Sequence, residues 1–465
     1  MPVPNSLKQL LETQNVNYNV SWTSVDTASN RIWHDQHLRN VGAVKSLILQ
    51  DKQGQLQVLI PADCLLDLKV VNRQLGRELR AMPRAALRRF FDKYQLQSIP
   101  ALPKLTGLPT LVDSRLLEPE ELLLDSGNSD QLLKLTQADF RQTLSDAEIC
   151  DITVPLKELE TDHGKTDDVN QIIGAVRNFT TLRVKQRLEE TLELPPLPDS
   201  AQRIIKMRVD PNADISDLAT IVETDPSLAA QVVSWAASPY YSAPGKIKSI
   251  HDAIVRVLGF DMVLNLALGL ALGKTLNIPK DGPEGMTSYW KMSVYTAAMV
   301  EGLVNSIPRE HRPGFGLAYL SGLLSNFGYL ILAEVFPPHF KTICRYIEAN
   351  PHAHHRVIEQ HILGISREQL SSWLMDLWYM PQEVVTALRF QNNPQCQGEH
   401  SEYAKLIYLA RSLLRQAGIG TGPREEVPPL LFEELHLERE KAEAALASVI
   451  ESSTELDTIA GQLAN

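Results

Sequence analysis

The first 150 residues alternate between helix-like and strand-like hydrophobic patterns. Ser6–Thr13 has the spacing of an amphipathic helix, whereas Val44–Gln50 and Gln55–Ile60 are short apolar runs typical of strands. The polar residues and glycine between those two runs predict a hairpin turn. A third short run, Thr110–Asp113, follows a loop rich in proline and glycine and predicts a buried strand. We therefore expect an α+β domain in this part of the chain.

Helical spacing dominates from Asp167 onward. Apolar residues at Ile172, Val176 and Phe179 predict one long helix reaching about Leu192. The chain from there to Gln391 reads as successive short helices separated by Gly, Pro and Asn, which predicts an all-α domain. The fold class is thus multidomain, with a mixed sheet and helices in an α+β part, followed by an all-α part. The predicted boundaries are 1–150 for the α+β domain, 151–193 for a linker with a connecting helix, 194–395 for the all-α domain and 396–465 for a C-terminal helical extension.

Composition narrows the class of protein. The 465 residues are 44% hydrophobic and 22% charged, an ordinary globular mix that excludes a disordered or fibrous chain. The four cysteines are far apart in sequence, which excludes a disulfide scaffold and a zinc knuckle. The N-terminal residues lack the pattern of a signal peptide, and the most apolar stretch, Val263–Gly273, is too short to span a bilayer. We expect a soluble cytoplasmic protein without a membrane partner.

The charge is divided unevenly along the chain. Residues 1–150 hold 17 basic and 17 acidic residues, so the remainder carries the whole net charge of −11. An acidic remainder favours protein partners over naked nucleic acid. A run of basic residues within the neutral part recurs at steps of three or four: Lys69, Arg73, Arg77, Arg80, Arg84 and Arg88. These six would share one face of a continuous helix, but Pro83 predicts a break into two short helices. Two interpretations stay open, a solvated surface and a patch that binds phosphate or RNA.

Five ordered motifs in the helical part carry a family resemblance. They are Leu194–Pro198, Ile221–Leu228, Ala237–Tyr241, Ile247–Ile250 and Ala253–Gly259. Over roughly residues 190–395 the chain resembles the HDOD domain, which is similar to the HD-type metal phosphohydrolases. The resemblance implies an all-α module of signalling or protein interaction. In the HD-type enzymes, His and Asp side chains on facing helices hold the metal.

The positions that would hold metal ligands in an HD-type enzyme carry other residues in this chain. They are Ser325 and Asn326 at the His-Asp pair, Met292 in the Trp-x-His-Ser segment, and Arg367, Gln391 and Asn392 in the later ligand-like stretches. Because a divalent cation needs carboxylate or imidazole donors, we predict no bound metal, no cofactor and no metal-dependent phosphohydrolysis. Three nearby histidines, at positions 352, 354 and 355, are interpreted as an exposed cluster in a loop or at a helix start.

The N-terminal part carries a weaker resemblance. Val41–Leu49, followed by a turn and a strand, and then Pro61–Asp63 before the basic run, is similar to a YbaK-type aminoacyl-tRNA deacylase domain. The resemblance implies that Lys45 is the functional lysine, holding the phosphate or ester end of a substrate as a point charge. An ordinary surface lysine is the other interpretation. The family's glycine-rich loop stands between Tyr94 and Gly107 without its paired glycines, so side chains would obstruct the reacting ester.

These observations favour a non-catalytic bacterial adaptor in signal transduction. Its HDOD module would bind a protein partner of a signalling pathway, or a ligand, and its N-terminal domain would be a pseudoenzyme that retains a site for tRNA or an aminoacyl ligand. The alternative is an aminoacyl-tRNA deacylase, a trans-editing hydrolase regulated by the HDOD domain. Lys45 is a catalytic candidate only under that alternative. The helical segment at 167–192 predicts a homodimer.

Overall fold

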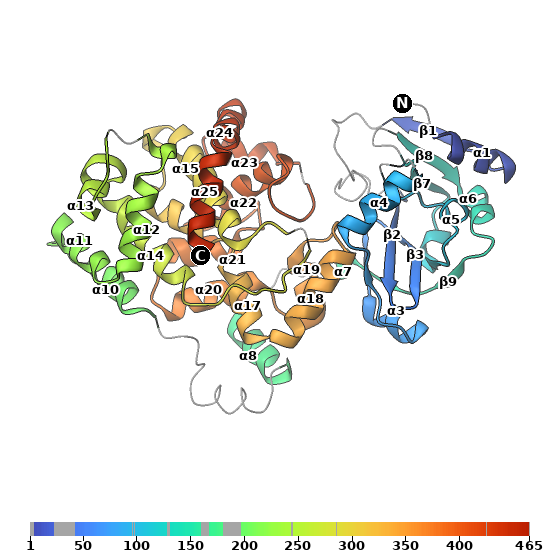
Figure 1. The fold of residues 1–465 in the computed structure, drawn as a ribbon, viewed down its shortest axis with the longest axis horizontal. Helices are drawn as coiled ribbons and strands as arrows, with labels where there is room; N and C mark the ends of the chain where they lie inside the picture. The colour runs from blue at the N-terminus through green and yellow to red at the C-terminus, as the bar shows by residue number, and fades with distance from the viewer. Residues whose placement is uncertain are drawn as a thin grey trace.

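The computed structural model describes residues 4–22, 42–127 except 95 and 97, 131–159, 167–179, 197–242, 245–284, 286–424 and 426–464. The described chain forms a mixed α/β domain at the N-terminus and a larger helical domain, which stand side by side (Figure 1). The predicted fold class is therefore confirmed. All four cysteines are free thiols.

The N-terminal domain is built on three small sheets. The largest has five strands in the order β5-β2-β3-β6-β9; the others are β1-β8-β7 and the pair β10-β4. The strands are β1 (Asn19–Trp22), β2 (Val44–Asp51), β3 (Gly54–Pro61), β4 (Cys64–Leu66), β5 (Arg80–Ala81), β6 (Thr110–Asp113), β7 (Glu121–Asp125), β8 (Gln131–Thr136), β9 (Glu148–Cys150) and β10 (Thr153–Pro155). The helices are α1 (Asn5–Thr13), α3 (Leu68–Leu75), α4 (Arg84–Tyr94), α5 (Pro103–Thr106), α6 (Gln137–Thr143) and α7 (Leu156–Leu159).

The hairpin of β2 and β3 forms where the sequence predicts it. The Asp51 carboxylate accepts hydrogen bonds from the backbone N–H groups of Gln53 and Gly54, at 2.8 and 3.1 Å, and so closes the two-residue turn. Strand β6 pairs in parallel with β3 on one side and with β9 on the other, and all four of its residues are buried. Strand β10 lies within the segment expected to be a linker, yet it pairs antiparallel with β4. The N-terminal domain therefore extends beyond residue 150.

The basic run contains two short helices, as predicted, but the break between them is longer than Pro83 alone indicates. Helix α3 ends at Leu75 because Gly76, at φ 63°, adopts the left-handed conformation that caps it. Arg77 belongs to no helix, and Arg80 lies on the edge strand β5. Only from Arg84 does the chain become helical again, in α4. The six basic residues therefore do not share one helical face.

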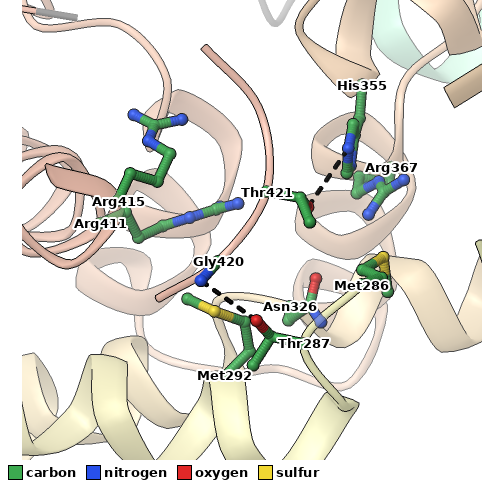
Figure 2. A pocket seen from close by; sticks show the side chains of 10 residues that line it. All are labelled: Met286, Thr287, Met292, Asn326, His355, Arg367, Arg411, Arg415, Gly420 and Thr421. Carbon is green, nitrogen blue, oxygen red and sulfur yellow. Dashed lines mark hydrogen bonds between the residues drawn. The ribbon is translucent and has the colours of Figure 1, made fainter. Parts of the chain in front are cut away.

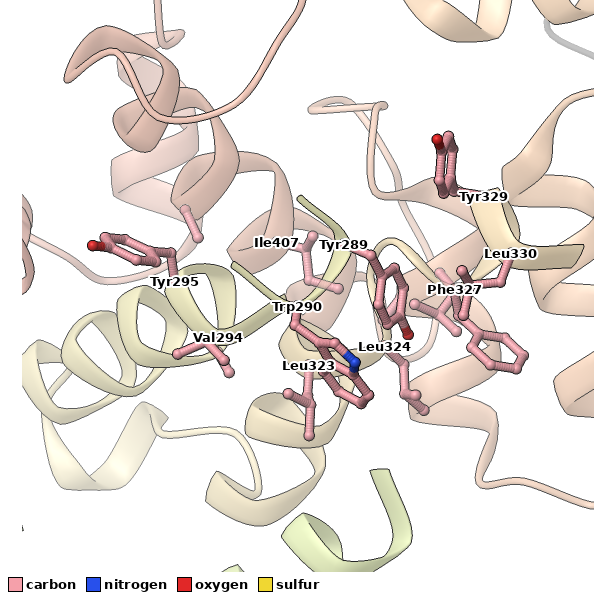
Figure 3. Close-up of a cluster of buried hydrophobic side chains, with 14 of the residues drawn as sticks. Tyr289, Trp290, Val294, Tyr295, Leu323, Leu324, Phe327, Tyr329, Leu330 and Ile407 are labelled. Carbon is pink, nitrogen blue, oxygen red and sulfur yellow. The ribbon is translucent and has the colours of Figure 1, made fainter. Parts of the chain in front are cut away.

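The helical domain surrounds a core of almost completely buried helices. Its helices are α8 (Asp168–Phe179), α10 (Asp199–Met207), α11 (Ile215–Glu223), α12 (Pro226–Ala236), α13 (Ile250–Ala253), α14 (Phe260–Gly273), α15 (Tyr289–Ser306), α16 (Phe315–Leu324), α17 (Phe327–Val335), α18 (Pro337–Ala349), α19 (His355–Leu363), α20 (Arg367–Leu377), α21 (Gln382–Phe390), α22 (Ser401–Gln416), α23 (Pro429–Glu434), α24 (Arg439–Glu451) and α25 (Ser453–Ala464). Side chains of α15, α16, α17 and α22 meet in the cluster of Figure 3, where Trp290, Leu323, Phe327 and Ile407 are buried. This packing includes α22, which lies in the predicted C-terminal extension.

One apolar stretch is long enough to cross a membrane by length and composition alone. It runs from Phe315 to Val335, and 89% of its most apolar window is buried inside the fold. Asn326 divides it into α16 and α17. Burial within the helical domain accounts for its apolar composition.

The connecting helix is attached to the helical domain by a buried ion pair. Asp168 of α8 pairs with Arg389 of α21, and the side-chain amide of Gln369 donates to Asp168 at 2.7 Å. Ile172 and Val176 are buried by the chain itself, whereas Val169 and Ile173 of the same helix are exposed. The described helix ends at Phe179, and the predicted continuation to Leu192 lies outside the described residues.

The two domains are joined by buried hydrogen bonds, which we call the domain interface. It comprises Cys64, Leu66 and Asp67 of the N-terminal domain, and Tyr346, Asn350, His352 and His361 of the helical domain. The Asn350 side chain accepts from the backbone N–H of Leu66 at 2.7 Å and donates to its carbonyl at 3.1 Å. His352 Nε2 lies 2.8 Å from the carbonyl oxygen of Cys64. The phenol of Tyr346 donates to Asp67 at 2.6 Å. Asn350 and His352 are both fully buried, so the joint is a packed one.

Candidate functional site

A pocket in the helical domain opens where the sequence analysis located the missing metal ligands (Figure 2). Met292 reaches it from α15, Asn326 from the junction of α16 and α17, and Arg367 from the first turn of α20. The residues that line it are Met286, Thr287, Met292, Asn326, His355, Arg367, Arg411, Arg415, Gly420 and Thr421. The fold therefore brings three of the six former ligand positions together in one pocket.

The other three positions lie next to this pocket. Gln391 accepts a hydrogen bond from the guanidinium of Arg411, and the Asn392 amide donates to Glu368 at 2.9 Å. Ser325 is the buried residue at the end of α16. At two of these positions, neutral amide side chains thus hydrogen-bond to an arginine and to a glutamate instead of binding a metal.

The pocket has a strongly positive lining. Among the described residues, its charged side chains are Arg367, Arg411 and Arg415, and none of the residues that line it is a carboxylate. Behind Arg367, the buried Glu359 accepts from the Arg367 backbone N–H at 2.8 Å and pairs with its guanidinium. Burial raises the pKa of Glu359 to about 7, although the neighbouring Arg367 lowers it. The carboxylate that pairs with Arg367 therefore holds a proton more readily than an exposed glutamate does.

Two further groups show the effect of burial next to like charges. Burial, followed by repulsion from Arg415, lowers the pKa of Arg411 to about 10. Burial, together with Arg367 and Arg411, lowers the pKa of His355 well below its ordinary value. His355 is therefore neutral at pH 7, and its Nε2 lies 3.4 Å from the hydroxyl of Thr421.

The chemistry of this donor set does not fit a divalent metal. Among the described residues, no group of three or more His, Cys, Asp or Glu side chains is placed to hold a metal ion. The amide of Asn326, the thioether of Met292 and the guanidinium of Arg367 at the ligand-like positions, with Arg411 and Arg415 beside them, repel a cation or bind it weakly. No metal-assisted hydrolytic step can therefore be built on this pocket.

The N-terminal candidate, Lys45, lies on β2 and is 1% exposed, so it is not an ordinary surface lysine. Its strand neighbour Ser46 belongs to a buried polar network. The Gln57 side-chain amide donates to the hydroxyl of Ser46 at 2.7 Å and to the carbonyl of Pro100 at 2.8 Å, while Thr106 donates to Gln57. These bonds attach the loop before Gly107 to the sheet.

Side chains of that loop are directed into the domain. Leu96, Ile99 and Leu102 are buried. A side-chain methyl of Leu96 packs so closely against Gly127 that a Cβ there would lie 2.7 Å from it. Beside it, Asp125 accepts from the Ser98 hydroxyl and, at 2.7 Å, from the Gly127 N–H, and burial raises the pKa of Asp125 to about 6. Apolar side chains thus occupy the region in which the deacylase family has paired glycines.

Two family models match separate parts of the chain. The HDOD domain matches residues 194–394, and the aminoacyl-tRNA editing domain matches residues 35–143. A crystal structure from Marinobacter aquaeolei VT8, of a protein provisionally named as a signal transduction protein, is 43% identical over 100% of both chains, with a TM-score of 0.89. This chain is an HDOD-domain protein with an N-terminal editing domain.

More distant relatives cover less of the HDOD-domain protein. An HDOD domain protein of unknown function from Geobacter sulfurreducens is 20% identical, covering 63% of this chain and 98% of that one, with a TM-score of 0.47. An uncharacterised protein of Treponema pallidum (strain Nichols) is 21% identical over 269 residues. The match covers 58% of this chain and 51% of the Treponema protein, so this chain spans about half the length of the curated relative that it matches.

The basic run of the editing domain follows the side that faces the HDOD domain. The backbone N–H of Lys69 donates to Tyr346 at 3.0 Å, that of Arg84 donates to Glu284 at 3.1 Å, and strand β5, which carries Arg80, packs beside α18. Arg77 pairs with Asp51. The other side chains of the run are exposed, namely those of Lys69, Arg73, Arg80, Arg84 and Arg88. Part of this segment therefore contributes to the joint between the domains.

The sequence analysis did not identify several residues of the pocket and of the domain interface. The interpretation of an exposed histidine cluster is wrong, because His352 is buried in the domain interface and His355 lines the pocket. Arg411 and Arg415 were not singled out. Their i, i+4 spacing within the apolar helix α22 was an available signal, since two arginines on one face of a mostly buried helix need a specific environment.

Proposed function

We propose that this HDOD-domain protein is a non-catalytic regulatory protein of the bacterial cytoplasm. Its HDOD domain binds a signalling partner protein or a ligand, and its editing domain is a degenerate tRNA or aminoacyl site. The observation that carries the proposal is the donor set of the pocket, where Met292, Asn326 and Arg367 replace metal ligands. A pocket with this lining suits recognition of a ligand better than metal-assisted hydrolysis.

The joint between the domains supports a regulatory role. Asn350 and His352 of the HDOD domain hydrogen-bond to the backbone of β4 in the editing domain, and both are fully buried. If one domain moves, either these hydrogen bonds break or the other domain moves with it. The two domains are thus mechanically connected, as a protein that couples two binding events requires.

The alternative function is an aminoacyl-tRNA deacylase regulated by the HDOD domain. It is favoured by Lys45, which matches the functional lysine of the family by resemblance and lies buried on β2. The inward-facing side chains of the loop, such as Leu96 against Gly127, argue against it because an ester substrate needs that space.

Hydrolysis of a panel of mischarged tRNAs by the full-length protein separates these functions. Lys45→Ala is measured beside Lys52→Ala, which changes an exposed lysine in the hairpin turn. We expect no turnover by any of the three proteins. Turnover that Lys45→Ala abolishes and Lys52→Ala preserves would overturn the proposal and establish the deacylase. A parallel assay with a phosphodiester substrate and Mn²⁺ is expected to show no hydrolysis, and activity that chelation removes would contradict the non-catalytic role.

The homodimer stays a prediction. Ile172 and Val176 are covered within the chain, and the exposed Val169 and Ile173 of α8 are the apolar residues of this helix that a dimer could cover. Light scattering at micromolar protein concentration distinguishes the two states, and a monomer mass would reject the dimer.

A further inference from the structure

The pocket at the former metal positions has the opposite polarity to a metal site. Arg367, Arg411 and Arg415 supply three positive charges, and the remaining polar lining consists of neutral groups. We infer that this pocket binds the phosphate group of a phosphorylated small molecule. The inference rests on the proposed function, because it names the ligand class of a regulatory HDOD domain.

The placement of the two arginines on α22 supports an anionic occupant. Arg411 and Arg415 are one helical turn apart, where like charges destabilise a helix. Among the described residues, no carboxylate lies within ion-pair distance of Arg411, and its guanidinium donates to the neutral amide oxygen of Gln391. Burying a guanidinium without a carboxylate is costly unless another anion compensates it. A phosphate between the arginines supplies that compensation.

The two acids described beside Arg367 are not part of the pocket lining. Glu359 compensates Arg367 only in part, because burial raises the pKa of Glu359 to about 7. Glu368 lies behind the pocket lining, where it accepts from the Asn392 amide. Neither carboxylate lines the cavity. A phosphate would therefore meet guanidinium groups directly, the donors with the geometry best suited to it.

Neutral donors complete the site. The pocket also presents the hydroxyls of Thr287 and Thr421 and the neutral imidazole of His355, each of which can donate to phosphate oxygens. In Figure 2, Arg411 and Arg415 come from one side and His355 and Arg367 from the other, with Thr421 between them. The donors thus converge on one space from opposite walls.

The loop after α22 brings the backbone close to this space. Gly418, Gly420 and Gly422 alternate along it with φ values of 83°, 99° and 107°, a conformation that other residues rarely adopt. A Cβ on Gly420 would lie 3.3 Å from the sulfur of Met292. Glycines at these positions let the main chain cover the pocket closely, as main chain does around bound phosphates.

The size of the space limits the ligand. The space behind the mouth of the pocket is only about 20 Å³, roughly that of one water molecule, and Met286 and Met292 form an apolar wall. A phosphate group would therefore bind from the open side with the organic part of its ligand outside, and a tRNA acceptor end or a folded protein segment does not fit in the pocket. The ligand is therefore a phosphorylated small molecule, for which a nucleoside monophosphate and inorganic phosphate serve as probes.

Isothermal titration calorimetry of the full-length protein tests the site. Inorganic phosphate, sulfate and AMP are titrated separately, and sulfate is expected to compete with phosphate because it is a dianion of the same shape. Arg411→Gln removes one charge-assisted contact, so its phosphate affinity is expected to fall about tenfold or more. Arg411→Lys keeps the positive charge but lacks the planar guanidinium, so its phosphate affinity is expected to lie between those of the unmodified protein and Arg411→Gln. Arg309→Gln changes an exposed arginine and is expected to bind as the unmodified protein does.

Three results would overturn the site. One is the absence of binding heat for phosphate, sulfate and AMP up to about 10 mM. Another is an equal loss in Arg411→Gln and Arg309→Gln, which would indicate non-specific surface attraction. The third is phosphate binding that Arg411→Gln leaves unchanged. If Arg411→Gln fails to fold by circular dichroism, competition between sulfate and phosphate on the unmodified protein decides, because independent binding of the two anions would reject a shared site.

These outcomes are distinguishable from failure of the proposed function. Loss of the phosphate site would leave the protein without turnover in the tRNA and phosphodiester assays. Turnover in either assay would reject the non-catalytic role whether or not phosphate binds. Tighter binding of AMP than of inorganic phosphate would assign the apolar wall to the organic part of the ligand, whereas equal affinities would restrict recognition to the phosphate group.

Discussion

Replacing Asn350 by alanine tests whether the domain interface is held as the structure indicates. The Asn350 side chain accepts from the Leu66 N–H at 2.7 Å and donates to the Leu66 carbonyl at 3.1 Å, as the backbone of a neighbouring strand would. It also donates to the carbonyl of Tyr346 at 3.0 Å. Alanine removes all three bonds and leaves the two polar groups of Leu66 without this partner in a fully buried position. At about 1–3 kcal/mol for each buried unsatisfied group, the interface should lose about 2–6 kcal/mol.

The measurement is amide hydrogen exchange of the full-length protein with and without Asn350→Ala. We expect faster exchange at Leu66 and in the adjoining α3, because opening of the interface becomes less costly. Scanning calorimetry is expected to show the two domains unfolding more independently than in the unmodified protein. Asn212→Ala, which changes an exposed asparagine, is the matched control. A change within about 0.5 kcal/mol for Asn350→Ala, equal to the control, would refute the reasoning.

Three further predictions concern buried carboxylates. Asp168→Ala leaves Arg389 buried without its carboxylate and is expected to destabilise the HDOD domain by about 3–5 kcal/mol in urea unfolding, and a loss under about 1 kcal/mol would contradict the buried pair. Because burial raises the pKa of Asp125 to about 6, the folded state binds the proton more tightly than the unfolded one. The thermal stability of the editing domain should therefore fall as pH rises from about 4 to about 6, and Asp125→Asn should remove that slope. Burial raises the pKa of Asp67, but hydrogen bonds from His361 and Tyr346 lower it further, so the pKa lies well below its ordinary value. The ionised carboxylate therefore stabilises the protein above pH about 5, and this contribution is lost on acidification. Asp67→Asn should flatten the acid limb of the stability profile, and an unchanged limb would reject this assignment.

Local patterns were sufficient for the elements of the fold. The hairpin of β2 and β3 followed from two apolar runs around a turn that Asp51 closes by hydrogen bonds to the next residues. Helix α12 begins at Pro226 with Asp225 as its cap, a signal contained in consecutive residues. Such features depend on neighbours in the sequence, and for that reason the sequence predicts them well.

The end of the first helix in the basic run was not predicted, although the sequence contains the residue that causes it. Its regular spacing suggested helices interrupted at Pro83, but Gly76 ended α3 earlier, in the left-handed conformation. Periodicity of charge is weak evidence for a helix because charged side chains are tolerated on strands and loops as well. Gly76, seven residues before the proline, carried the more decisive information.

The site could be predicted only in part, because its contacts are distant in sequence. The loss of metal ligands was evident from Asn326 and Arg367 themselves, but their new partners were not. Arg411 and Arg415 lie beyond the predicted end of the all-α domain, in a helix whose packing into the core no local pattern indicates. His352 binds the carbonyl of Cys64, which is 288 positions away. Burial of a histidine by a second domain leaves no signature in the residues around it.

Helix α19 connects the arginine pocket with the domain interface. At the start of α19, His355 lines the arginine pocket; one turn later, Glu359 holds Arg367; near its end, His361 Nε2 lies 3.3 Å from Asp67 of the editing domain. A nine-residue helix is short and stiff, so a change in its position at the pocket is transmitted to the domain interface. Phosphate bound beside Arg367 would compete with Glu359 for that guanidinium and so alter the force on α19. The phosphate site inferred above and the contact of His361 with Asp67 are thus attached to one helix, so phosphate binding is expected to change hydrogen exchange at the domain interface.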